Sequence, residues 1–131
     1  MTDLDLARLA VACKHWKWMP GMLAIAYDEQ AWRCVDHRVR EDVEDVGQVW
    51  ANASGSCDMF FGPLLTQRLT PDLTDPATVG CLLALVREAW GDPMLFAFPD
   101  AFPDRWTVVN VDCGHHETEA AALVAALEAA P

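Results

Sequence analysis

The stretch DPATVGCLLALVREAWGDP, residues 75–93, decides the fold because it specifies one complete helix with a signal at each end. Asp75 is a good N-cap, and Pro76 suits the first helical position, where a missing N–H costs nothing. Gly91 is suited to end the helix in a left-handed conformation. Nearly every face between these signals is apolar, and the stripe expected to be buried holds Val79, Leu82, Leu83, Val86 and Trp90. Such a helix is central in a core or is covered by a second subunit.

Two further helices and two strand pairs surround this helix in the sequence. Residues 3–15 hold apolar side chains at helical spacing after an acidic first turn, and residues 118–129 are rich in Ala, a strong helix former. The stretch 22–36 has two apolar runs on either side of a polar pair, which predicts a hairpin. Residues 94–98 and 105–111 predict two more strands, joined by a Pro-rich turn.

The segment 37–74 is the least readable part of the chain and is expected to be irregular. Within it, HRVREDVEDV (37–46) fits a short helix or a strand, and MFFGPLL (59–65) fits a buried strand or an exposed interaction segment. The order of elements is therefore helix, two strands, an irregular middle, helix, two strands and helix. This order predicts an α+β fold in a single domain over residues 1–131, because strands joined by short turns pair antiparallel. We expect three helices and one antiparallel sheet of about four strands, with the helix at 76–90 packed on it.

A weak internal repeat accompanies this order. Trp16 and Trp90 lie 74 residues apart, each near a helix end, and Trp32 and Trp106 lie 74 residues apart in the second strand of each pair. One explanation is a duplicated helix–hairpin unit whose two copies share one sheet. The other is that apolar strands after helices generally look alike.

The bulk composition indicates a globular protein and excludes several classes of function. Of 131 residues, 53% are hydrophobic and 22% are charged, and the formal net charge is -11. A chain this acidic is not expected to bind nucleic acid, because phosphate contacts need Lys and Arg. No apolar run approaches the ~20 residues that span a bilayer, and we expect that the first residues are not a secretory signal. Five Cys without a framework spacing indicate reduced thiols, so we expect a cytoplasmic location.

An acidic cluster within REDVEDV is the candidate partner-binding site, and its members are Glu41, Asp42, Glu44 and Asp45. Regular rows of carboxylates imitate a phosphate backbone in proteins that block nucleic-acid-binding enzymes. The cluster therefore predicts a basic or nucleic-acid-binding protein as partner. The simpler interpretation is a solvated face that keeps the chain soluble.

Aromatic and basic residues gather in KHWKWMPGM, residues 14–22, and a neighbouring strand adds an Arg. Such residues hold an anion or a base by stacking and cation–π contact. The candidate ligand-binding set is Trp16, Lys17, Trp18 and Arg33, with Trp18 expected to be the more exposed Trp. The alternative is that these residues form core packing and a turn.

The stretch DCGHHE, residues 112–117, brings together side chains of the types that bind metals. It holds the metal-ligand types Cys113, His115, His116 and Glu117, but no paired zinc spacing is present. We therefore expect a polar connection into the last helix and neither metal nor cofactor. The sequence also contains no phosphate-binding loop, serine-hydrolase elbow or metalloprotease motif. We accordingly expect a protein that is not an enzyme.

Parts of the chain resemble small bacteriophage and prophage proteins without an assigned activity. The resemblance rests on PDLTDPATVGCLLALVREAWGDP (71–93), on TEAAALVAALEAAP (118–131) and on an early ACK-W-W-PGM pattern at 12–22. It covers about half the chain and carries no catalytic residue. It implies a phage or prophage accessory protein in the cytoplasm of a bacterial host.

These patterns together predict a non-enzymatic accessory protein that binds a host protein, for example one in a defence system. Capture of a small molecule such as a nucleotide signal is one alternative, and a structural role in the phage particle is another. We also expect a homodimer, because the helix at 76–90 and the stretch MFFGPLL (59–65) offer more apolar surface than a small core needs.

Overall fold

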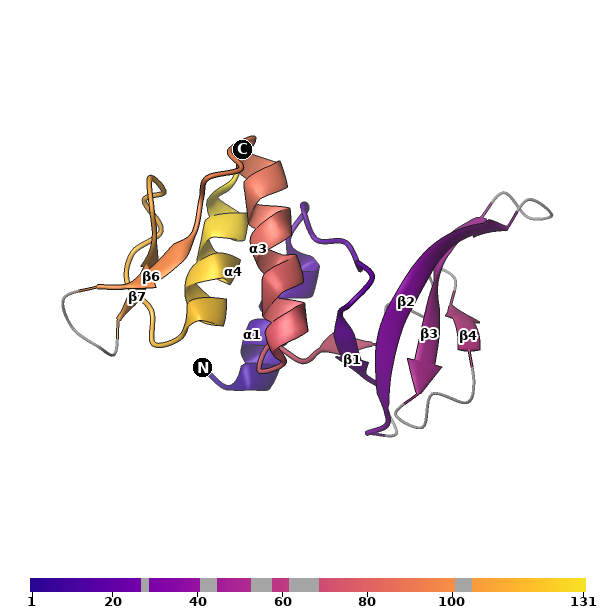
Figure 1. The fold of residues 1–131 in the computed structure, drawn as a ribbon. Coiled ribbons are helices and arrows are strands. Elements are labelled where there is room, and N and C mark those ends of the chain that lie inside the picture. Colours follow the sequence, from indigo (N-terminus) through magenta and orange to yellow (C-terminus); the bar gives the residue numbers. More distant parts are fainter. Residues whose placement is uncertain (27–28, 41–44, 53–57, 62–68, 101–104) are drawn as a thin grey trace. The chain divides into compact units, whose positions relative to one another are not determined.

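The computed structural model describes six ranges of the chain, which are 1–26, 29–40, 45–52, 58–61, 69–100 and 105–131 (Figure 1). Within them the chain forms an α+β structure with three helices and antiparallel sheets, which confirms the predicted fold class. Two compact units divide the chain. Unit 1 is Met1–Lys17 with Val79–Pro131, and unit 2 is Trp18–Thr78. The prediction that residues 1–131 are one domain stays a prediction, and each unit is described by itself.

Helix α1 spans Asp3–Ala12 and begins with a reciprocal capping box. The Thr2 hydroxyl accepts a hydrogen bond from the Asp5 N–H at 3.1 Å, and the Asp5 carboxylate accepts one from the Thr2 N–H at 3.1 Å. The Thr2 hydroxyl also donates to the Asp5 carboxylate at 2.8 Å, and this bond, with the one from the Thr2 N–H, lowers the pKa of Asp5 by favouring the ionised form. The helix was predicted to reach residue 15 and ends earlier, because Cys13 takes an extended backbone conformation and its N–H returns to the Ala10 carbonyl.

Helix α3 spans Pro76–Trp90 and ends as the sequence predicts. Gly91 has a φ of 63°, and its N–H donates to the Glu88 carbonyl at 3.2 Å. The Asp92 N–H donates to the Arg87 carbonyl at 3.0 Å, which completes a Schellman motif. The left-handed conformation explains why a Gly stands at position 91.

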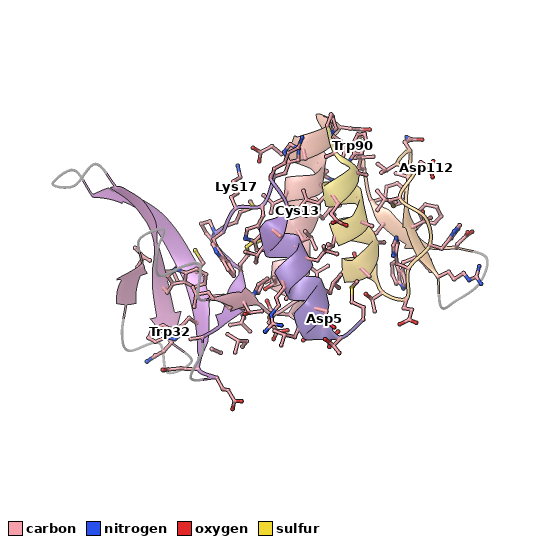
Figure 2. All side chains as sticks on the ribbon, turned by 180° about the vertical axis from the view of Figure 1, so that it is seen from behind. Asp5, Cys13, Lys17, Trp32, Trp90 and Asp112 are labelled. Carbon is pink, nitrogen blue, oxygen red and sulfur yellow. The ribbon has the colours of Figure 1, made fainter. Side chains whose placement is uncertain are left out.

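The core of unit 1 is built between helices. Figure 1 shows α4, which spans Glu119–Ala129, between α1 and the strand pair of this unit. Fully or almost fully buried side chains come from α3 and α4, namely Leu82, Leu85, Val86, Leu123, Val124 and Leu127. The Trp90 indole N–H donates to the Ala126 carbonyl at 2.8 Å (Figure 2). Helix α3 is not buried on every side, because Gly80, Ala84 and Glu88 form an exposed line at helical spacing.

Unit 1 also contains a small two-stranded antiparallel sheet. Strand β6 spans Ala97–Pro99 and strand β7 spans Trp106–Val108. Residue His116 adds a further bridge to Trp106, with backbone hydrogen bonds of 2.6 and 2.8 Å in the two directions. The strands expected at 94–98 and 105–111 are therefore present but shorter.

Unit 2 holds a five-stranded antiparallel sheet in the order β4-β3-β2-β1-β5. The strands are β1 (Leu23–Ile25), β2 (Ala31–Arg40), β3 (Asp45–Asn52), β4 (Asp58–Phe61) and β5 (Thr70–Pro71). The expectation that residues 37–74 are irregular is wrong, since most of these strands lie there. Asp and Glu have low strand propensity and obscure the strand pattern in the sequence, whereas β2 and β3 are defined by their pairing with each other.

The core of unit 2 is rich in Trp. Trp18, Trp32 and Trp50 are at most 7% exposed, and the rings of Trp18 and Trp50 meet edge to face at 5.3 Å. The pairing of β2 with β3 skips Val35, which is 46% exposed, while the neighbouring Cys34 is buried. Val35 lies on the face opposite Cys34, as strand alternation requires, and the ladder continues beyond the irregularity at Asp36.

The 74-residue spacing of the predicted repeat is present in the strand positions, but the residue pairs within the two strand pairs do not match. Strands β1 and β6 are offset by 74 residues at both ends. However, Ala24 pairs with Trp32, whereas Phe98 pairs with Thr107, one position later than the repeat requires. The two strand pairs also lie in separate sheets, so the expected single shared sheet is wrong. The antiparallel pairing of the first hairpin continues instead into β3 and β5.

Candidate functional site

The β2–β3 ladder of unit 2 includes the residues that border the predicted partner-binding acids in the sequence. Backbone pairing runs from Trp32 and Asn52 to Arg40 and Asp45, the last pair before the connection. Glu41, Asp42 and Glu44 lie in this connection, outside the described residues. Asp45 is the first residue of β3, and its side chain is not described. The ladder therefore brings both ends of the acidic connection together.

The predicted ligand-binding residues divide between the two units. Trp16 and Lys17 belong to unit 1, whereas Trp18 and Arg33 belong to unit 2. The expectation that Trp18 is the more exposed Trp is wrong, because its side chain is only 6% exposed and packs on Trp50. Lys17 contacts Glu88 at 2.8 Å, with both side chains more than half exposed (Figure 2). The interpretation of this set as a ligand site stays a prediction.

Arg33 takes part in a hydrogen-bonded network at the start of α3. Its guanidinium binds both carboxylate oxygens of Asp75, at 2.7 and 3.2 Å, and donates to the Gly21 carbonyl at 2.9 Å. The same carboxylate accepts from the Thr78 N–H and hydroxyl, at 3.0 and 2.9 Å. The buried Thr78 hydroxyl in turn accepts from the Leu23 N–H at 2.8 Å. The helix cap thus joins β1 and β2 to the first turn of α3.

The hydrogen bonds of this network determine the ionisation state of Asp75. The hydrogen bonds from Arg33 hold the pKa of Asp75 below its ordinary value, with further help from Thr78. Asp75 is therefore ionised at neutral pH and caps the helix as a charge-assisted acceptor. The sequence identified Asp75 as an N-cap but gave no signal for its partner Arg33. The role of Arg33 in this structure is to hold the cap in place.

The histidines of DCGHHE are separated by their partners. His115 Nε2 lies 2.6 Å from an Asp100 carboxylate oxygen, with both side chains partly exposed. His116 Nε2 lies 2.7 Å from the Cys113 carbonyl, which only accepts, so this nitrogen donates. In the part of the chain that the structure describes, no three His, Cys, Asp or Glu side chains gather as a metal site. The arrangement instead orders the connection between β7 and α4.

A hollow of about 750 Å³ lies in unit 1 where α1 and α4 begin. Its lining combines basic, acidic, hydroxyl and apolar side chains, including Arg105, His115, His116, Asp3, Glu117, Thr2 and Thr118. Both Thr hydroxyls cap their own helices, at 3.1 Å for Thr2 and 3.0 Å for Thr118. The acids at these helix starts complement the helix dipoles, so the hollow offers no net preference for an anion. No signal in the sequence indicated that Thr2 lies beside the histidines.

Comparisons with protein-family models, curated proteins and solved structures gave no match to this chain. Among the described residues, no helix has the length and apolar character needed to cross a membrane.

Proposed function

We propose that this chain is a non-enzymatic accessory protein of a bacteriophage or prophage that binds a basic protein in the cytoplasm of the bacterial host. The contact is made by the hairpin acids, which we define as Glu41, Asp42, Glu44 and Asp45. The observation that carries the proposal is the pairing of Arg40 with Asp45 at the end of the β2–β3 ladder. This pairing supports the proposal because Arg40 and Asp45, which stand on either side of the other three acids in the sequence, lie opposite each other.

Charge supports the choice of partner. Unit 2 contains ten acidic and four basic residues, and the hairpin acids are four of those ten. A local excess of one sign steers a partner of the opposite sign and raises the association rate at low salt. A host protein that normally binds nucleic acid presents such a basic surface. A protein of a host defence system is the narrower form of the proposal.

The test compares two variants with the same change in net charge. The first converts all four hairpin acids to their amides. The control converts two Asp and two Glu that are exposed in unit 1, namely Asp3, Asp112, Glu117 and Glu128. The wild-type chain is used to isolate a binding protein from a bacterial lysate, and its affinity for all three forms is then measured by calorimetry at several salt concentrations.

We expect the hairpin variant to lose at least about tenfold in affinity and most of the salt dependence. The control is expected to change affinity less than about threefold. Equal losses in the two variants would show that only net charge matters. Unchanged binding of the hairpin variant to every isolated protein contradicts the proposal outright.

A further inference from the structure

We draw no further inference here: the strongest candidate, the apolar patch of Met94, Phe96 and Phe98 at strand β6 of unit 1, carries nothing because nothing in the described part of the chain shows what covers it.

Discussion

The two units of this protein are stabilised by different kinds of contact around α3. In unit 1, α3 and α4 contribute fully buried aliphatic side chains such as Leu82 and Leu123. In unit 2, the first turn of α3 is tied to the sheet by the polar network of Arg33, Asp75 and Thr78. Apolar packing is insensitive to pH, whereas a network centred on a carboxylate depends on its ionisation. One helix therefore takes part in two regions that should respond differently to mutation and to acid.

The largest effect is expected from a cavity in unit 1. Leu123→Ala removes a side chain that is 0% exposed and should lower the free energy of unfolding by about 3 kcal/mol. Denaturant unfolding measures the loss, and hydrogen exchange should show faster exchange in α4. Leu4→Ala, at a site that is 47% exposed, is the control and should cost less than about 1 kcal/mol. A cost below this limit at Leu123 would contradict the assignment of the core.

A somewhat smaller effect is expected from the network in unit 2. Asp75→Ala removes the helix cap together with the partner of Arg33 and Thr78, so we expect a loss of about 2 kcal/mol. Hydrogen exchange should accelerate in β1 and in the first turn of α3. Asp112→Ala, an exposed acid in unit 1, is the control and should leave both regions unchanged (Figure 2). Faster exchange confined to unit 1 would contradict the proposed role of Asp75.

Lowering the pH should weaken the carboxylate network in unit 2 and not the apolar packing in unit 1. The pKa of Asp75 is lower in the folded chain than the ordinary 3.8, so its contribution to stability is fully present above 3.8. The contribution is lost as the pH falls through the folded pKa. Asp75→Asn should therefore be less stable than the wild type at neutral pH, with a difference that shrinks below pH 3.8. Unfolding curves at a series of pH values measure it, and a constant difference would argue against an ionised cap.

The smallest expected changes in the free energy of unfolding are at two glycines, one inside α3 and one just after it, and they have opposite signs. Gly91→Ala places a side chain at φ +63° and should cost about 1 kcal/mol. Gly80→Ala lies inside α3 with no atom within 4 Å of the new Cβ, so it should stabilise by about 0.5 to 1 kcal/mol. Thermal unfolding of both variants checks the signs. A gain at position 91 would refute the Schellman end of the helix.

Local signals predicted the helices well, and non-local pairing explains most errors. The bounds of α3 match the expected 76–90, because Asp75 and Gly91 are local signals. Segment 37–74 was expected to be irregular, although β3 pairs with β2 along eight residue pairs. The burial of Trp18 also depends on Trp50, which is distant in sequence. The acids of the candidate partner site were visible as a cluster in the sequence, but only the ladder register shows that Arg40, which precedes them, pairs with Asp45.

The sequence by itself determined where the described helices begin, where α3 ends and which residues carry the excess of acid. Helix caps and local charge depend on residues that lie within a few positions of each other, so they can be predicted from the sequence alone. Only the tertiary structure decided that Arg33 holds Asp75, 42 positions away, and that the two strand pairs lie in separate sheets. Strand pairing and ion pairs join distant residues, and the pattern of one strand does not name its partner.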